Sequence, residues 1–184
     1  MRIENFNYYF KLYLSALFIF AVYFLFQKYN NPVEWTISEW LINYQGGFTR
    51  RGLLGELVHQ LNKILPFTYR EIILGLQILS YFTYYLLIYF YFKKIKKNYL
   101  LIFAIFSPLF IIYPIAEVEV LARKEIFLFI SFILIANILS NQNIKNSHYF
   151  YFSIILTIST LIWEGVIIYL SFFIFLLIIK NNFL

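Results

Sequence analysis

The sequence predicts an all-α protein, a transmembrane bundle of about six spans with two interfacial amphipathic helices between the first two spans. Three observations predict this fold class. The chain of 184 residues is 62% hydrophobic and only 13% charged, whereas soluble domains are about 45–50% apolar. Its apolar residues fall into runs long enough to cross a bilayer as helices. Between the first two runs, apolar residues instead recur at helical spacing among polar ones.

Four membrane-crossing helices are expected from apolar runs at residues 8–26, 72–92, 99–115 and 126–139. The first run is long, bulky and not followed by a small-residue cleavage site, so it is interpreted as a retained span. Thr68 and Glu71 have the spacing of a capping box that opens the second span. In the third, Pro108 and Pro114 are expected to kink or end the helix.

The last apolar block, residues 149–179, is broken by Trp163, Glu164 and Gly165. It is too long for one ordinary span and short for two. We interpret it as two short spans that meet at Glu164, with a re-entrant pair as the alternative. Residues 1–184 are treated as a single transmembrane domain, and whether they are a fragment of a longer protein stays open.

The segment between the first two spans is interpreted as two helices at the membrane surface. Residues 31–34 have a helix-start pattern, with asparagine as N-cap, proline next and glutamate in the first turn. Trp40 is of the type found at headgroup level, and Gly46 and Gly47 stop the helix. A second helix follows Thr49 and ends before Pro66. Its apolar face is expected to consist of Leu54, Leu57, Val58, Leu61 and Leu65.

Counting spans places almost every acidic residue on one side of the membrane. All nine acidic residues are glutamate, and only Glu4 falls on the other side. The eight on the shared side are Glu34, Glu39, Glu56, Glu71, Glu117, Glu119, Glu125 and Glu164. Lysines and arginines divide almost evenly, but the compact lysine cluster at 93–97 indicates a cytoplasmic turn. We therefore expect a multi-pass protein of the bacterial inner membrane with its N-terminus in the cytoplasm.

The first candidate site is the loop that joins the two surface helices. Gly46 and Gly47 allow unusual backbone angles and close approach of a ligand. Arg50 and Arg51 stand at the start of the second helix, where the helix dipole also favours an anion. Guanidinium groups bind phosphate through paired hydrogen bonds. The pattern predicts a lipid phosphate or pyrophosphate site; the alternative is a helix break whose arginines contact ordinary anionic headgroups.

The second candidate site is the short turn before residue 126. It contains Glu117, Glu119, Arg123, Lys124 and Glu125, more charge than a solubilising turn needs. The functional interpretation is a catalytic carboxylate, Glu117 or Glu119, beside a charge-balancing cation. The alternative is a solvated turn with ion pairs at helix ends, in which Glu125 favours the start of the next helix.

The third candidate is Glu164, because a carboxylate near bilayer depth is costly unless it is paired or hydrated. A hairpin tip in water is the alternative to this functional interpretation of Glu164.

His59, one turn from Glu56, is conceivable as a base or metal ligand but is more often an interfacial polar residue. The chain has no cysteine, which excludes thiol chemistry, and no aspartate. The net charge of +6 is expected to report topology and anionic lipid, and no nucleic-acid-binding pattern is present.

Over residues 8–140 this layout resembles the N-terminal half of the GT-C glycosyltransferases, which use polyprenyl-phosphate-linked sugars at the outer membrane face. The resemblance implies that Glu34 or Glu39 corresponds to the family's first essential acid, and Glu117 or Glu119 to the second. It implies that Arg50, Arg51 and Arg123 neutralise the departing lipid phosphate. The family's first acid is usually aspartate, which is absent here.

The resemblance also implies the partners: membrane lipid, a polyprenyl-phosphate sugar donor and a glycan acceptor. Substrate contacts are expected from Gly46, Gly47, Arg50, Arg51, Arg123, Lys124 and Glu164. A divalent metal is left open as a cofactor, with no metal ligand assigned. Polymerases or ligases of surface polysaccharides are the nearest alternative. A transporter subunit with Glu164 and Glu119 as proton relay sites, or a scaffold that docks partner helices, are the alternatives from other classes.

Overall fold

The structure is a computed structural model that describes residues 6–31, 34–95, 98–107, 111–116, 121–140 and 146–182. Every regular element within these ranges is a helix, which confirms the predicted all-α class. The helices are α1 (Phe6–Asn30), α2 (Glu34–Leu41), α3 (Gly52–Ile64), α4 (Tyr69–Lys94), α5 (Tyr99–Phe106), α6 (Tyr113–Ala116), α7 (Ile126–Leu139), α8 (Asn146–Ile162) and α9 (Val166–Asn182).

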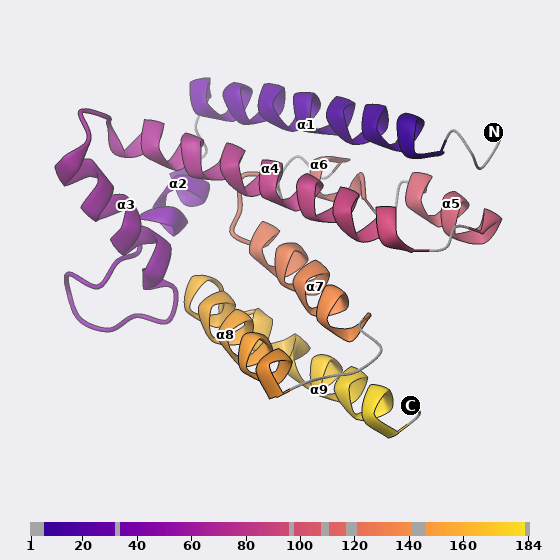
Figure 1. Cartoon of the computed structure of the whole chain (residues 1–184). Coiled ribbons are helices and arrows are strands. Elements are labelled where there is room, and N and C mark those ends of the chain that lie inside the picture. The colour runs from indigo at the N-terminus through magenta and orange to yellow at the C-terminus, as the bar shows by residue number, and fades with distance from the viewer. Residues whose placement is uncertain are drawn as a thin grey trace.

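Helices α1 and α4 are the two described helices long and apolar enough to cross a membrane. They have 25 and 26 residues, or roughly 38 Å at 1.5 Å per residue, against about 30 Å of hydrocarbon. They lie side by side along their lengths (Figure 1). The capping box predicted at the start of α4 is confirmed: Thr68 accepts from the Glu71 amide, and the Glu71 carboxylate accepts from the Thr68 amide.

The remaining apolar helices are shorter. Helix α7 begins and ends at the predicted residues 126 and 139. Helices α8 and α9 have 17 residues each and are separated by residues 163–165, so the predicted break in the last apolar block is confirmed. An added Cβ at Gly165 would lie 2.4 Å from the Trp163 ring. A larger residue here would displace the Trp163 ring, which folds back over this turn.

The predicted span over 99–115 is not one continuous helix; of the two effects expected of Pro108, a kink or an end of the helix, the structure shows an end. Helix α5 has only 8 residues and ends at Phe106, about 12 Å of helix and far less than a bilayer requires. The backbone of Ser107 is extended, with φ −66° and ψ 141°. Ser107 precedes Pro108, whose ring disfavours the helical region for the residue before it. The proline therefore ends the helix, and the short helix α6 follows separately.

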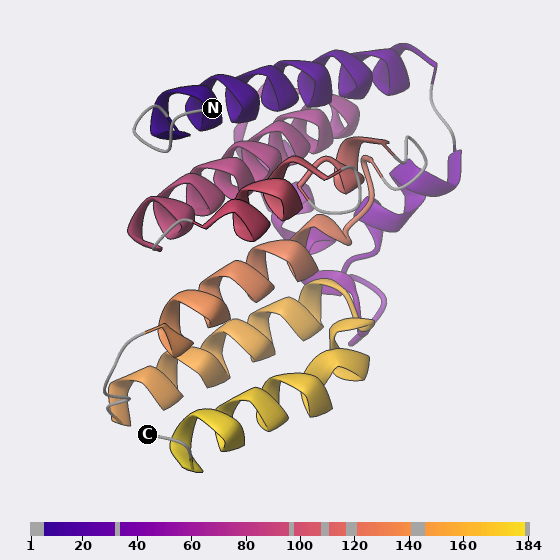
Figure 2. The ribbon, with the colours of Figure 1, turned by 90° about the vertical axis from the view of Figure 1, so that its right-hand side faces the viewer.

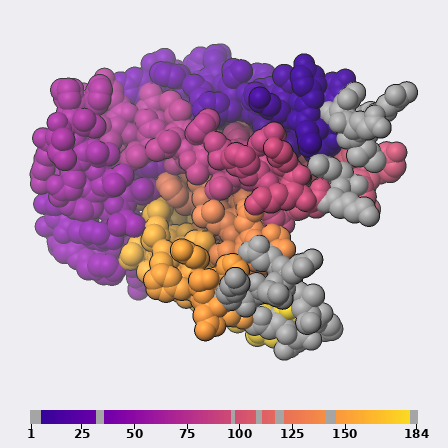
Figure 3. All heavy atoms as spheres, in the orientation of Figure 1, coloured from indigo at the N-terminus to yellow at the C-terminus, as the bar shows by residue number. Residues whose placement is uncertain are grey.

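The helices form layers, with α4 and α7 between α1 on one side and α8 and α9 on the other (Figure 2). Helices α2 and α3 form a rounded end of the molecule and cover the ends of α4 and α8 (Figure 3). Leu54 and Val58 of α3 pack with Ile72, Ile73 and Ile162. Burial of this apolar face fixes the surface helices on the bundle.

The predicted apolar face of α3 is correct only in part. Leu54 and Val58 are buried, whereas Leu57 is 44% exposed and Leu65 is also exposed. Helix α3 thus packs one stripe against the bundle and leaves further apolar side chains at the surface, as expected of a helix that lies on a membrane.

The predicted start of α2 falls partly on residues 32 and 33, which lie outside the described residues; α2 itself begins at Glu34.

Helices α2 and α3 approach each other closely at Gly55. A Cβ added there would lie 1.9 Å from the carbonyl oxygen of Ile42, just after the end of α2. This neighbour is backbone and cannot rotate away. Glycine at this position therefore sets the distance between the end of α2 and α3, and with it the position of the loop that joins them.

Candidate functional site

Charged side chains from four separate segments meet where α2 and α3 cover the bundle. We call them the ion cluster: Glu39, Arg51, Arg123, Lys124, Glu125 and Glu164. Glu39 belongs to α2 and Arg51 immediately precedes α3. The turn before α7 supplies three members, and the turn between α8 and α9 supplies Glu164.

Arg51 joins the two outermost parts of the ion cluster. Its Nη1 lies 3.5 Å from Glu39 Oε1. Its Nε donates a hydrogen bond of 3.1 Å to Glu164 Oε1, and its Nη2 contacts the same oxygen. The side chains of Arg51 and Glu164 are 38% and 33% exposed. A ligand can therefore reach this ion pair, and it can also reach Arg123, whose side chain is 32% exposed.

Arg123 forms the ion pairs on the side of the turn before α7. Its Nη2 lies 2.5 Å from Glu125 Oε1, and its Nε lies 3.9 Å from Glu39 Oε2. The Glu39 side chain is only 9% exposed and stands between two guanidinium groups. Removing a carboxylate from water is costly unless opposite charges surround it, and the two arginines meet that requirement.

Lys124 is fully buried beneath the arginine loop. Its Nζ donates a hydrogen bond of 2.9 Å to the carbonyl oxygen of Arg51. The pKa of Lys124 is lowered to about 8, chiefly by burial; the Glu39 charge opposes this shift and the Arg51 charge adds to it. Lys124 therefore exchanges its proton close to neutral pH while it holds the start of α3 in place.

Glu125 keeps its proton more readily than an ordinary glutamate. Burial raises its pKa, Glu39 raises it too, and the Arg123 guanidinium opposes them. The Oε2 atoms of Glu39 and Glu125 are buried and have no hydrogen-bond partner among the described residues. Two carboxylate oxygens therefore remain available inside the cluster for a proton or a polar group of a ligand.

The turn that supplies the inner half of the cluster is held by three helices. The Ala122 carbonyl accepts hydrogen bonds from Trp40 Nε1 at 2.7 Å and Gln77 Nε2 at 2.8 Å. Lys28 Nζ donates to the Leu121 carbonyl at 3.1 Å. Ala122 has φ of +79°, a left-handed conformation that costs about 1–2 kcal/mol for a residue with a Cβ. These bonds from α1, α2 and α4 hold the turn in that conformation.

Trp40 does not contact lipid headgroups, although its residue type is typical of that level. It is completely buried, and its indole N–H donates a hydrogen bond to the Ala122 carbonyl in the turn before α7. Gln77 was also missed as a supporting residue. A signal for it exists in the sequence, because it is a polar residue inside the apolar run that becomes α4. An amide there requires a buried partner.

The predicted glycine and arginine loop divides between the cluster and the surface. Gly46, Gly47 and Arg50 are exposed and lie outside the ion cluster. Gly47 has φ of +115°, so its glycine is explained by the backbone of the turn. Gly46 has no neighbouring atom within 4 Å of an added Cβ. Of the two adjacent arginines, the structure brings only Arg51 to the other charges.

Three predicted acids cannot be placed in the site. Glu117 and Glu119 lie outside the described residues. Glu34 begins α2, but only its backbone is described. Glu125 was recognised as part of the charged turn but not selected as a site residue, because its position before a helix had a sufficient explanation in the helix dipole.

The contacts given for His59 are with Tyr69 and not with the ion cluster. Its Nδ1 is 3.1 Å from the Tyr69 hydroxyl, and the two rings are stacked. In the part of the chain that the structure describes, no three His or Glu side chains are grouped closely enough to hold a metal ion. Glu56, one turn away, accepts hydrogen bonds from the Tyr44 amide and from Gln60, so it stabilises the loop between α2 and α3.

Comparison of the chain with protein-family models, with curated proteins and with solved structures gives no match in any of the three.

Proposed function

We propose that this chain is a membrane glycosyltransferase that takes a sugar from a polyprenyl-phosphate carrier at the membrane surface, for the assembly of a bacterial surface glycan. The observation that carries the proposal is the ion cluster. Three cations and three carboxylates from four segments meet at one end of an apolar bundle, beneath helices suited to a membrane surface. Phosphate on a lipid and a polar acceptor would meet at such a place.

The proposed topology is about six membrane crossings with the N-terminus in the cytoplasm of the bacterial cell. Because α5 and α6 are each too short to span, the third crossing in this proposal is the whole segment between α4 and α7 and not a single helix. In support, Glu39, Glu56, Glu71, Glu125 and Glu164 all lie at the end of the bundle where α2 and α3 pack. Helices α7, α8 and α9 are about 21–26 Å long. They fit this topology if the bilayer is locally thin or if flanking residues reach the headgroups.

The contacts of Arg51 indicate how the phosphate would bind. Glu164 is the most exposed partner of Arg51, and Glu39 is the most buried one. An incoming phosphate would replace Glu164 on the open side of the guanidinium, while Glu39 keeps the arginine in position. A guanidinium bound to two phosphate oxygens would then stabilise the negative charge that grows on the leaving group.

The acid–base role belongs to a carboxyl group beside this phosphate. Among the described residues Glu125 is the best suited, because its raised pKa makes it a stronger base than an ordinary carboxylate. Glu125 would accept the proton of the acceptor hydroxyl as the sugar leaves the phosphate. Glu117 and Glu119 precede it in the same turn and, by the resemblance to GT-C enzymes, are the competing candidates for this role.

The experiment is a transfer assay with the purified protein in lipid nanodiscs. Undecaprenyl-phosphate glucose, labelled in the sugar, is the donor, a bacterial surface-glycan preparation supplies the acceptor hydroxyl, and transfer of the label from the lipid to the glycan is measured. We expect Glu125→Gln and Arg51→Ala to lower the rate by at least about 100-fold, the size of a lost acid–base or charge-stabilising group. Glu71→Gln is the matched control, since glutamine also completes a capping box. Equal rates in Glu125→Gln and wild type would refute the role of Glu125.

The transporter alternative is less well supported. It requires Glu164 to act as an isolated relay site within the bilayer. Glu164 is instead paired with Arg51 of the surface loop and is one-third exposed. The ion pair with Arg51 occupies the carboxylate that a relay would have to use.

A further inference from the structure

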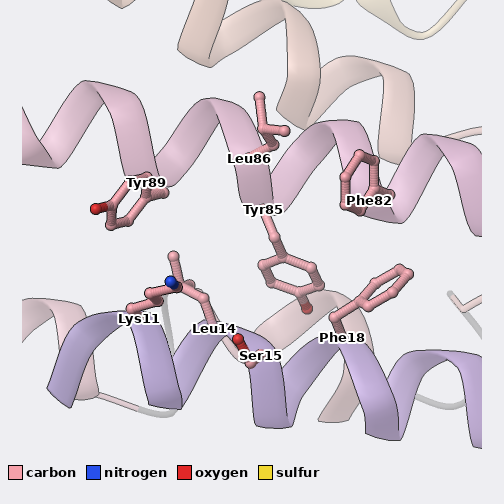
Figure 4. A pocket seen from close by; sticks show the side chains of 8 residues that line it. All are labelled: Lys11, Leu14, Ser15, Phe18, Phe82, Tyr85, Leu86 and Tyr89. Atoms are coloured by element: carbon pink, nitrogen blue, oxygen red, sulfur yellow. The ribbon is translucent and has the colours of Figure 1, made fainter. Parts of the chain in front are cut away.

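A second site lies in a cleft between α1 and α4, at the end of the bundle opposite the ion cluster. The cleft has a volume of about 220 Å³ and is lined by Lys11, Leu14, Ser15, Phe18, Phe82, Tyr85, Leu86 and Tyr89 (Figure 4). It combines an apolar floor with one cation and three hydroxyl groups. None of these residues belongs to the site proposed for sugar transfer.

We propose that this cleft binds one anionic phospholipid of the leaflet that surrounds the N-terminal half of α1. The lipid phosphate would lie beside Lys11, and an acyl chain would lie along the aromatic and aliphatic wall. The inference stands on the shape of the cleft, on its charge and on one buried hydroxyl group. It does not depend on the proposed transferase activity.

The buried hydroxyl belongs to Tyr85. This side chain is 4% exposed, and in the described part of the chain its hydroxyl has no hydrogen-bond partner. The ring extends from α4 toward α1, so the hydroxyl points into the cleft between Ser15 and Phe18 (Figure 4). Buried hydroxyl groups without a partner are uncommon and cost free energy. An oxygen of a bound glycerophosphate group would accept its hydrogen bond.

The charge at this end of the bundle is positive. Lys11 is exposed and forms no ion pair with a described residue. Lys93 lies over the ring of Tyr89, with its Nζ 5.9 Å from the ring centroid. The carboxylates described in the structure lie at the opposite end, and Glu4 is outside the described residues. Lys11 in the cleft and Lys93 nearby attract an anionic headgroup. Tyrosine side chains are also enriched at the depth of the lipid headgroups.

The apolar part of the cleft fits a hydrocarbon chain. Phe18 and Phe82 pack edge to face with ring centroids 5.7 Å apart and close the cleft away from Lys11. Phe82 and Leu86 are also 48% and 38% exposed, so the wall continues onto the outer surface of α4. A headgroup at Lys11 therefore lies one to two helical turns from apolar surface, the arrangement of a phospholipid in a leaflet.

The test is phosphatidylglycerol binding by native mass spectrometry, with phosphatidylcholine as the neutral comparison lipid. Wild type is compared with Lys11→Gln, Tyr85→Phe and the matched control Lys180→Gln. Lys180 is in the last turn of α9, away from α1, so the control removes the same charge outside the cleft. We expect at least about fivefold weaker binding of phosphatidylglycerol to Lys11→Gln and Tyr85→Phe, and no change in Lys180→Gln.

Thermal unfolding separates a ligand site from a merely unsatisfied hydroxyl group. Without added lipid, Tyr85→Phe is expected to unfold at a higher temperature than wild type, because it removes a buried group that lacks a partner. Addition of phosphatidylglycerol should raise the unfolding temperature of wild type more than that of Tyr85→Phe. The difference between the two unfolding temperatures should therefore become smaller. Equal gains in both proteins would overturn the proposal.

Two further outcomes would also overturn it. If phosphatidylcholine binds as tightly as phosphatidylglycerol, the cleft does not select charge. If undecaprenyl phosphate displaces phosphatidylglycerol and Lys11→Gln abolishes that displacement, the occupant is the carrier lipid and not a bulk phospholipid. Both outcomes leave the proposed transfer reaction at the ion cluster untouched, since neither concerns Arg51 or Glu125.

Discussion

Lys124 gives the sharpest quantitative prediction, because it is buried and charged at neutral pH. Its pKa in the folded protein is about 8, below the ordinary 10.5. Below the lower value the lysine is protonated in both states, and the folded protein carries the full penalty of a buried charge. As pH rises from about 8 to 10.5 the folded state loses its proton first and the penalty disappears. Stability should therefore increase with pH across this window.

The size of the effect follows from the two pKa values. Between about pH 7.5 and pH 9.5, linkage predicts a gain of about 2 kcal/mol in the free energy of unfolding. Lys124→Met keeps the length of the side chain and removes the titration, so its stability should not rise over the same interval.

The assay is denaturant unfolding in detergent at several pH values, followed by tryptophan fluorescence. Trp40 and Trp163 both lie near the ion cluster and report on it. The quantity compared is the wild-type free energy minus that of Lys124→Met, which cancels the other titrating groups. A difference that stays constant from about pH 7.5 to pH 9.5 would refute the argument that burial depresses this pKa.

Three other predictions concern the fold that supports the site. Gly55→Ala should separate α2 from α3 and lower the midpoint of thermal unfolding, whereas Gly46→Ala, at an open position, should leave that midpoint nearly unchanged. Trp40→Phe should destabilise the protein by about 1–3 kcal/mol in chemical unfolding, because it removes a buried hydrogen bond; a loss below about 0.5 kcal/mol would contradict this. The chain has no cysteine, so single cysteines at Phe48 and Ser140 can report topology. An impermeant maleimide should label them from opposite sides of the membrane, and labelling of both from one side would refute the six-span topology.

Much of the fold could be predicted because local signals decide it. The capping box before α4 and both ends of α7 are correct, since capping residues and apolar runs act over a few residues. The prediction of a continuous span over 99–115 is wrong for an equally local reason, the effect of Pro108 on the residue before it. Pro108 not only kinks a helix but also forces Ser107 into an extended conformation, which leaves α5 too short to be a span.

Less of the site could be predicted, because it depends on pairings between distant segments. Arg51 and Glu164 were both candidates, but they are separated by 113 residues, and no local pattern joins them. Arg50 and Arg51 are adjacent and of the same type, yet only the second faces the bundle. Trp40 illustrates the same limit: its residue type is typical of the interface, whereas tertiary packing buries it against the Ala122 carbonyl.

The central claim is that the ion cluster binds a lipid phosphate through Arg51. The most direct measurement is saturable binding of undecaprenyl phosphate to the purified protein, compared between wild type, Arg51→Ala and the neighbouring control Arg50→Ala. The account predicts binding in wild type, retention in Arg50→Ala and loss by about tenfold or more in Arg51→Ala, the size of a charge-assisted hydrogen-bond pair. Equal binding by Arg51→Ala and wild type, or no saturable binding by any of the three, would contradict it.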